Sequence, residues 1–140
     1  MKKKTVKTLK RILWERYVSP YIRQRDNGIC FTCGVRKNWK AMHAGHFISK
    51  GSYSDTEFDE INIHCQCPSC NTFKHGNLRE YTLRMIDKYG LGKVQELRKR
   101  SYGTKRWKAE ELETLIEYYK KRLDSLKNNT KKPENRYWLG

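Results

Sequence analysis

Four of the five cysteines form two pairs that each enclose two residues, and they are Cys30, Cys33, Cys67 and Cys70. Two such pairs can present four thiolates tetrahedrally to one Zn²⁺, which then fastens together two segments of the chain. Reduced, buried cysteines are the competing interpretation, but the paired spacing favours a metal. Cys65 lies two residues before Cys67, and we expect it to be a small structural residue rather than a ligand. The sequence therefore predicts a structural zinc site.

Histidine and asparagine side chains surround these pairs, at His43, His46, Asn62, His64, Asn71 and His75. If residues 41–48 form a strand, His46 and His43 point to opposite faces of it unless a bulge intervenes. If a helix begins within the second cysteine pair, Asn71 and His75 lie four positions apart on one face. That spacing lets both side chains approach one ion, so the pattern allows a second metal site beside the cysteines.

The charge of the chain points to a polyanionic partner. Lys and Arg number 31 against 15 Asp and Glu, which gives a formal net charge of +16 and a pI near 9.8. A basic surface kept only for solubility is the competing interpretation. No apolar run approaches the roughly 18 residues that a membrane span requires. We therefore expect a cytoplasmic protein without a membrane partner.

Length and hydropathy fit a small core with helical extensions. The chain has 140 residues, 36% of them hydrophobic, and its mean hydropathy is -0.99. Few apolar side chains are therefore available for burial, and we expect the zinc to help stabilise the fold. We expect four parts, which are basic N-terminal helices (1–28), a zinc-bracketed core (29–76), C-terminal helices (77–128) and a polar tail (129–140).

Local signals place the helices of the flanking parts. Apolar residues recur on one face over residues 5–18, which predicts an amphipathic helix. Ser19 and Pro20 resemble the N-cap and first position of a second short helix. Asn77 with Glu80 resembles a capping box that opens a later helix. Each signal predicts a boundary as well as a helix.

The longest predicted helix covers residues 108–127 and carries an apolar stripe from Leu112 to Leu126. Packing of this stripe inside the chain is the preferred interpretation. A homodimer formed through it is the alternative, although the heptads are too few to argue a coiled coil.

Basic residues concentrate in two segments that flank the core in sequence. We expect them to contact DNA phosphates, and they are Lys7, Lys10, Arg11, Arg98, Lys99, Arg100, Lys105, Arg106 and Lys108. Tyr102 and Trp107 are interleaved with the second segment and could stack on unpaired bases. For Trp107 we expect core packing instead.

The order His46, Asn62, Asn71 between two cysteine pairs resembles the HNH, or ββα-metal, nucleases. More closely, the segments YIRQRD, CFTCG, AGHFISKG and FDEINIHCQCPSCN are similar to a phage recombination endonuclease family called NinG or Rap. Members of that family act on branched DNA such as Holliday junctions and D-loops. The similarity runs over residues 19–127. It implies an α+β fold in which a zinc-bracketed ββα core carries helical extensions. It also implies that the protein is located in the cytoplasm of the host cell.

The resemblance also implies roles for individual residues. His46 would be the general base that takes a proton from the attacking water, Asn62 would hold the loop that orients it, and Asn71 would ligate a single Mg²⁺ or Mn²⁺. The expected products carry a 5′ phosphate and a 3′ hydroxyl. Many HNH nucleases have a second metal ligand directly before the base, where this chain has Gly45. His75 is the first candidate to replace it.

Further candidates for that second ligand are His43, His64 and the acidic residues Asp55, Glu57, Asp59 and Glu60. Two other functions compete with a structure-selective endonuclease. One is a zinc module that binds nucleic acid without cleaving it, in which His46 is structural and Asn71 is a helix cap. The other is a homing or restriction nuclease that recognises a DNA sequence.

Overall fold

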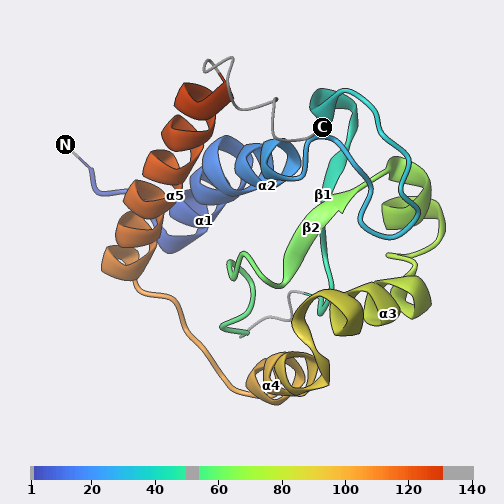
Figure 1. The fold of residues 1–140 in the computed structure, drawn as a ribbon. Coiled ribbons are helices and arrows are strands. Elements are labelled where there is room, and N and C mark those ends of the chain that lie inside the picture. The colour runs from blue at the N-terminus through green and yellow to red at the C-terminus, as the bar shows by residue number, and fades with distance from the viewer. Residues whose placement is uncertain (1, 50–53, 131–140) are drawn as a thin grey trace.

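The structure of the chain, a computed structural model, describes the backbone of residues 2–49 and 54–130 and the side chains of these residues except 129 and 130. The helices are α1 (Val6–Ile12), the π-helix η1 (Leu13–Val18), α2 (Ser19–Arg25), the 3-10 helix η2 (Trp39–Ala41), the π-helix η3 (Ser69–Phe73), α3 (Leu78–Tyr89), α4 (Leu91–Ser101) and α5 (Ala109–Thr130), and the strands are β1 (His43–His46) and β2 (Ile63–Gln66). Figure 1 shows α1 and α5 to the left of the strands, α3 to the lower right and α4 below the strands. None of the described helices combines the length and apolar character needed to cross a bilayer. The predicted polar tail lies almost wholly outside the described residues.

The first three helical segments join into one continuous run, in contrast to the predicted break at Ser19. Ser19 has helical torsion angles (φ -61°, ψ -48°), and its N–H donates to the carbonyl of Trp14, five residues back. Pro20 has no N–H, so one backbone hydrogen bond of a regular α-helix cannot form there. The wider π turn before it accommodates this missing hydrogen bond, and the helix continues. The predicted N-cap is therefore wrong, whereas α2 ends as expected before Gly28, which has a φ of +69°.

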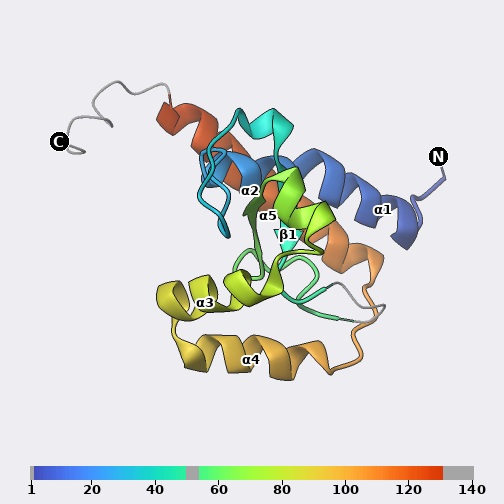
Figure 2. The ribbon, with the colours of Figure 1, turned by 90° about the vertical axis from the view of Figure 1, so that its right-hand side faces the viewer.

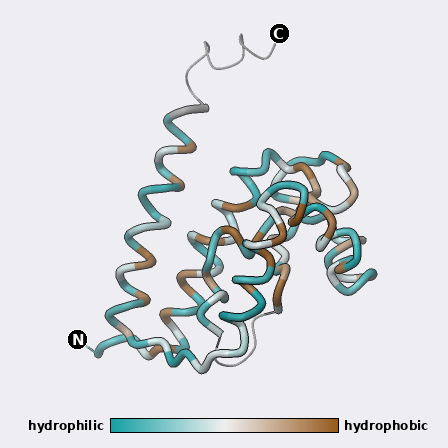
Figure 3. The backbone as a smooth tube through the Cα atoms, turned by 60° about the horizontal axis from the view of Figure 1, so that its bottom comes forward, coloured by the Kyte–Doolittle hydropathy of each residue, from teal (hydrophilic) through white to brown (hydrophobic). Residues whose placement is uncertain are grey.

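The long helix α5 packs on this N-terminal run and completes the main apolar core. Its buried residues Leu112, Tyr119 and Leu123 join Leu13 and Ile22 in one cluster. Figure 3 shows hydrophobic stretches recurring along α5 between hydrophilic ones, as expected for a helix with one buried face. The predicted packing of the stripe inside the chain is confirmed. A homodimer stays a prediction.

Two short antiparallel strands connect the regions of the two cysteine pairs. They pair in regular register from His43 opposite Gln66 to His46 opposite Ile63, so no bulge occurs at Gly45. Helix α2 contacts both strands, and all residues of β2 are buried. The chain is thus a mixed α and β protein with a small two-stranded sheet, in agreement with the predicted fold class. Its HNH-like character stays a prediction.

Helices α3 and α4 form a second apolar cluster against the end of β1, made of Phe47, Tyr81, Met85, Val94 and Leu97. The predicted capping box at the start of α3 is wrong. Asn77 has a left-handed backbone (φ 48°), which asparagine tolerates better than most residues, and its side chain makes no cap hydrogen bond. Its Nδ2 lies instead 3.5 Å from Sγ of Cys70. The turn before α3 is therefore tied to the second cysteine pair.

Candidate functional site

The four paired cysteines converge at one point of the structure. The Sγ atoms of Cys30, Cys33, Cys67 and Cys70 all lie within 4.8 Å of one another. Four sulfurs held tetrahedrally at about 2.3 Å from a zinc ion are roughly 3.8 Å apart, and Sγ of Cys33 is 3.7 Å from Sγ of Cys67. The cluster could therefore hold a metal ion such as zinc. Cys65 lies outside it, and burial raises the pKa of its thiol to about 12.

Nearby donors favour thiolates in this cluster. Burial raises the pKa of Cys30, but the Thr32 hydroxyl, 3.3 Å from its sulfur, and neighbouring backbone N–H groups lower it, to about 6 in total. Burial and the adjacent thiols raise the pKa of Cys33 to about 12. One thiolate thus forms readily, whereas the further ones need a cation to balance their charge.

A hollow of about 380 Å³ opens beside the cysteine cluster. Its lining includes Trp14, His46, Ser49, Asn71, His75 and Gly76. These residues come from the N-terminal helical run, from β1 and the segment that follows it, from η3 and from the turn after η3. None of the described lining side chains is a carboxylate. The hollow therefore combines imidazole and carboxamide groups without acidic ones.

The imidazole of His46 is oriented by two segments that are distant in sequence. Its ring stacks on Trp14 with centroids 4.9 Å apart and an interplanar angle of 18°. Its Nε2 lies 2.8 Å from the carbonyl oxygen of Glu57. Because a carbonyl only accepts, Nε2 carries the hydrogen in the neutral ring and Nδ1 carries the lone pair. This tautomer can accept a proton at Nδ1, as a general base must.

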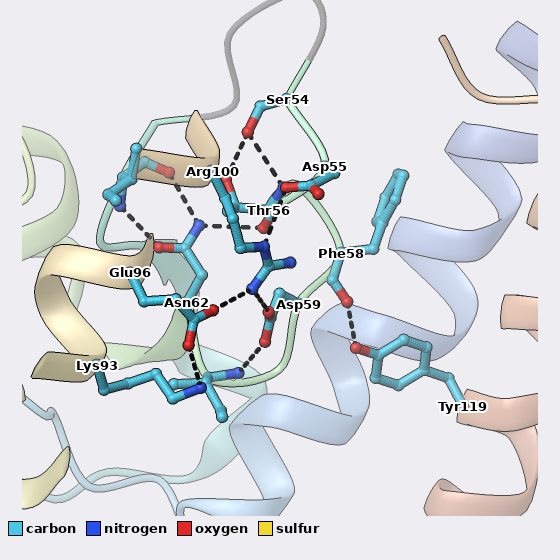
Figure 4. A network of polar contacts seen from close by, with 12 residues as sticks. Ser54, Asp55, Thr56, Phe58, Asp59, Asn62, Lys93, Glu96, Arg100 and Tyr119 are labelled. Atoms are coloured by element: carbon cyan, nitrogen blue, oxygen red, sulfur yellow. Dashed lines mark hydrogen bonds and ion pairs between the residues drawn. The ribbon is translucent and has the colours of Figure 1, made fainter. Parts of the chain in front are cut away.

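The loop that presents the Glu57 carbonyl is held by a buried asparagine. Oδ1 of Asn62 accepts from the N–H of Ile48 (2.9 Å), and its Nδ2 donates to the carbonyls of Ile48 (3.0 Å) and Thr56 (3.1 Å). Asn62 therefore joins the segment after β1 to the segment before β2, on both sides of the loop, as Figure 4 shows. These hydrogen bonds are of the kind that Asn62 needs for its predicted role, which is to hold the loop that orients His46.

Arg100 of α4 anchors the same loop from outside. Its guanidinium lies 2.8 Å from Asp59 Oδ2, 3.3 Å from Asp55 Oδ1 and 3.1 Å from Glu96 Oε1. The hydroxyl of Tyr119 on α5 donates to the carbonyl of the adjacent Phe58 (Figure 4). We predicted Arg100 as a DNA contact, but its charge is engaged by carboxylates of its own chain. It acts here as a support for the loop that orients His46.

Replacing Arg100 by Ala is expected to lower the free energy of unfolding by about 1 kcal/mol, because partly exposed ion pairs contribute little each but here form a network. Lys99→Ala removes the same charge from an exposed neighbour and should change it by less than about 0.5 kcal/mol. Urea unfolding of both zinc-loaded variants, followed by circular dichroism, measures the difference. Equal effects would show that Arg100 does not anchor the loop.

Two carboxamides, those of Asn71 and Gln66, lie close to Gly45, and Asn71 also lines the hollow. Nδ2 of Asn71 lies 3.0 Å from Nδ1 of His43. A Cβ added at Gly45 would lie 1.9 Å from Oε1 of Gln66 and 2.8 Å from Oδ1 of Asn71, so a larger residue here would displace both carboxamides. Gln66 is fully buried and its Nε2 donates twice, but among the described residues its Oε1 has no hydrogen-bond partner. Two amide oxygens, which hard divalent ions accept as ligands, thus face the position of the expected second ligand.

Asn71 and His75 do not share a helix face as predicted. The π-helix η3 ends at Phe73, and His75 has a left-handed backbone with a φ of 50°. Both side chains nevertheless line the hollow. The acidic residues 55–60 do not line it, since their carboxylates pair with Lys10, Arg100 and Arg122. His75, which lines the same hollow as Asn71, and His43, whose ring contacts the Asn71 side chain, therefore stay candidate second ligands.

His64 is a buried histidine with both ring nitrogens in use. Its Nδ1 lies 3.1 Å from the hydroxyl of Tyr81 and its Nε2 lies 2.8 Å from the hydroxyl of Tyr89, while Phe31 stacks on the ring at 4.0 Å. Burial, with a smaller effect of the nearby Arg25, lowers the pKa of His64 to about 3. The ring is therefore neutral at physiological pH and not placed to hold a metal.

This low pKa predicts acid sensitivity. Between pH of about 6.5 and about 3 the unfolded chain binds a proton at His64 that the folded chain does not, so stability present above pH 6.5 is lost as the pH falls. The loss approaches roughly 1.4 kcal/mol per pH unit. We expect His64→Gln to show a shallower decline of unfolding free energy from pH 7 to pH 5 than the parent chain. Parallel declines would rule out His64 as the cause, because thiolate protonation affects both proteins.

The predicted DNA-contacting residues divide into two groups. Lys10, Arg11, Arg100 and Lys105 face carboxylates of the chain. The exposed remainder are Lys7, Arg98, Lys99, Arg106 and Lys108. Trp107 packs edge-on against Phe58 with ring centroids 5.5 Å apart, as expected, whereas Tyr102 is 84% exposed. DNA contact by all these residues stays a prediction.

Sequence reasoning missed the contacts made by Trp14, the Glu57 carbonyl and Gln66. A glutamine between two cysteines of a strand is a weak local signal of a buried polar role. The other two contacts join segments far apart in the chain and leave no local signal.

Comparisons with known proteins place the chain among bacteriophage proteins. A family model described as "Bacteriophage Lambda NinG protein" matches residues 1–129. The chain is 34% identical over 113 residues to protein ninG of Escherichia phage 933W, and 33% identical over the same length to protein ninG of Salmonella phage P22 and of Escherichia phage lambda. These matches cover 80% of this chain and 54% to 55% of each relative, so the chain spans about half the length of the curated relatives that it matches. No solved structure shows a significant match.

Proposed function

The chain belongs to the NinG family of bacteriophage proteins, and we propose that it is a metal-dependent DNA endonuclease of the HNH type that hydrolyses phosphodiester bonds in branched DNA. The observation that carries this proposal is that His46 and Asn71 line one hollow beside the cysteine cluster. The net charge of +16 suits a polyanionic substrate. The resemblance to HNH and recombination nucleases supplies the reaction and the preference for Holliday junctions and D-loops.

His46 would take the proton of the attacking water at Nδ1. The Glu57 carbonyl fixes that tautomer and disperses part of the positive charge that the ring gains. The water oxygen bonds to phosphorus, the bond from phosphorus to the 3′ oxygen breaks, and that oxygen takes up a proton. The products then carry a 5′ phosphate and a 3′ hydroxyl, and Trp14 keeps the ring in place by stacking.

Asn71 would hold the catalytic cation through its carboxamide oxygen, with His75 as the first candidate for a second protein ligand. When bound, Mg²⁺ or Mn²⁺ neutralises charge on the scissile phosphate and on the departing 3′ oxygen. The Oε1 of Gln66, which has no hydrogen-bond partner among the described residues, and the Oδ1 of Asn71 both lie close to Gly45 and fit an oxygen-rich site. The cysteine cluster would hold a structural Zn²⁺ separately.

The absence of carboxylates from the described lining of the hollow predicts that cation and DNA bind cooperatively. Phosphate oxygens must supply the negative charge, so DNA should raise the affinity for Mn²⁺ and Mn²⁺ should raise the affinity for DNA by the same factor, which we expect to be about 5-fold to 150-fold. Paramagnetic resonance titration of Mn²⁺ with and without a phosphorothioate junction that resists cleavage measures it. Asn71→Ala should abolish the coupling, and an equal Mn²⁺ affinity in both titrations would contradict it.

The proposed function is tested by incubating the zinc-loaded protein with four-way junctions, D-loops, flaps and linear duplex in Mg²⁺ or Mn²⁺. We expect junctions or D-loops to be cut faster than linear duplex of the same sequence. If every substrate stays intact although the protein binds DNA, the chain is a non-catalytic nucleic-acid-binding module. Cleavage of one duplex sequence without regard to branching would indicate a homing or restriction nuclease.

A further inference from the structure

A basic concavity lies between the end of α2 and the loop that follows the first cysteine pair. It is lined by Gln24, Asn27, Arg36, Lys37, Asn38 and Trp39, which we call the knuckle surface. It shares no lining residue with the hollow around His46. Its charged lining residues are both basic, and the sequence has no Asp or Glu between Asp26 and Asp55. The surface therefore carries positive charge without local compensation.

This charge is not neutralised by ion pairs within the described part of the chain. No carboxylate there lies within ion-pair distance of Arg36 or Lys37, and both side chains belong to exposed residues. In contrast, Lys10, Arg100 and Lys105 of the two predicted DNA-binding segments do face carboxylates. The knuckle surface is thus a further candidate for phosphate contacts, beside the exposed cations of those segments.

The backbone of the surface is fixed before any ligand binds. The N–H of Lys37 donates to the carbonyl of Gly28 (3.0 Å), and a Cβ at Gly28 would lie 2.0 Å from the carbonyl oxygen of Lys37. Ile29 and Arg36 form an isolated antiparallel bridge. The N–H of Cys30 donates to the carbonyl of Val35 (2.8 Å), so the cysteine cluster anchors the loop. A preorganised surface loses little conformational entropy on binding.

One face of the aromatic ring in this surface is occupied by a cation of the same chain. The guanidinium of Arg23 lies 5.0 Å from the centre of the Trp39 ring, and its Nη1 donates to the Trp39 carbonyl (3.4 Å). The remaining lining groups are amides and cations, which bind phosphate oxygens without reading sequence. These features favour the backbone of a duplex over unstacked bases of a single strand.

The surface lies at the other end of the molecule from α4. Figures 1 and 2 both show η2 above the strands and α4 below them. It is therefore not a continuation of the basic segment in α4, and one continuous duplex need not cover both. Two separate basic surfaces can each contact one duplex arm of a branched DNA, in which the arms meet at one point.

We propose that the knuckle surface binds the phosphate backbone of a second duplex arm of DNA, while the strand to be cut lies in the hollow around His46. The proposal rests on the proposed function for the identity of the polymer. It adds a physical source for a preference for branched DNA, because a linear duplex would engage one surface and a junction both.

The test is DNA binding by the full chain, loaded with zinc, in Ca²⁺ without cleavage. The double variant Arg36→Ala/Lys37→Ala is compared with Lys120→Ala/Lys121→Ala, which removes the same charge from two exposed residues of α5. Fluorescence anisotropy with a labelled four-way junction and a linear duplex gives affinities over a range of salt. Zinc content and circular dichroism establish that both variants are folded.

We expect the knuckle variant to bind the junction at least 10-fold more weakly, with the linear duplex affected less. Its slope of log affinity against log salt on the junction should fall by up to about 1.8, two phosphates at roughly 0.9 each. The α5 variant should stay within about twofold of the parent, since its charges lie outside the contact. Equal effects of both variants, or equal losses on junction and duplex, would overturn the proposal.

The outcome is independent of catalysis. If the parent chain binds junctions through Arg36 and Lys37 but cuts no substrate, the proposed function fails and the knuckle surface stands. If the parent chain cuts junctions and the knuckle variant binds them as tightly as the parent, the knuckle surface fails and the proposed function stands.

Discussion

Cleavage of junction DNA by a His46→Ala variant is expected to be about 10²-fold to 10⁴-fold slower than cleavage by the parent chain, the usual contribution of a general base. The reason lies in the tautomer, because the Glu57 carbonyl directs the hydrogen to Nε2 and places the lone pair on Nδ1. Single-turnover rates with saturating protein isolate the chemical step from binding.

Two controls make this result specific to proton transfer. The variant should keep its zinc and bind the junction within about twofold of the parent, because His46 is not a ligand of the cysteine cluster. His46→Gly should regain part of the rate when imidazole is added to the buffer. His64→Gln, which changes a histidine outside the hollow, should cut at nearly the parent rate. A His46→Ala protein that cuts within threefold of the parent would exclude His46 as the base.

Removal of the structural metal is expected to unfold the middle of the chain. Binding free energies of structural zinc are about 10 to 16 kcal/mol in small peptides, which equals or exceeds the roughly 5 to 15 kcal/mol of net stability of most domains. Among the described residues, the apolar cluster of the cysteine region consists of Met42 and the buried cysteines, so we expect burial there to contribute too little to replace the metal. Chelation should abolish the cooperative thermal transition of this region.

Cys67→Ser and Cys65→Ser form a matched pair for this prediction. Both residues are buried, but only Cys67 belongs to the four-sulfur cluster. Metal analysis should find about one zinc in the Cys65→Ser protein and little in the Cys67→Ser protein, whose thermal midpoint should fall much further. Zinc retention by Cys67→Ser together with its loss from Cys65→Ser would show that the ligands are assigned wrongly.

The helix boundaries show where local signals were insufficient. Ser19 before Pro20 has the residue types of an N-cap, yet the helix passes through it as a π turn. Asn77 with Glu80 has the residue types of a capping box, yet Asn77 takes a left-handed conformation and turns toward Cys70. In both cases the packing around the cysteine cluster or the neighbouring helices outweighs a cap that contributes only about 1 kcal/mol.

The sequence by itself determined the two cysteine pairs of the four-sulfur cluster and the packing faces of the long helices. Cysteine pairs with two intervening residues form compact turns, so their ligand geometry is largely local. An apolar stripe repeats along a helix with a fixed period, so the buried face of α5 can be predicted without knowing which element packs against it. Each cysteine pair and each helix face depends on residues close together in the chain, whereas the meeting of the two pairs, which lie far apart in sequence, depends on the fold.

Only the tertiary structure decided which polar groups meet in the hollow. The Glu57 carbonyl determines the tautomer of His46, and Trp14 determines the position of its ring. Arg100, on a helix more than forty residues away in sequence from Asp59, supports the loop that carries Glu57. Such contacts join groups by distance in space, and any of several carbonyls or cations could make them. No periodicity records that choice, so the ion pairs of Arg100 with Asp55 and Asp59 could not be predicted from its basic segment.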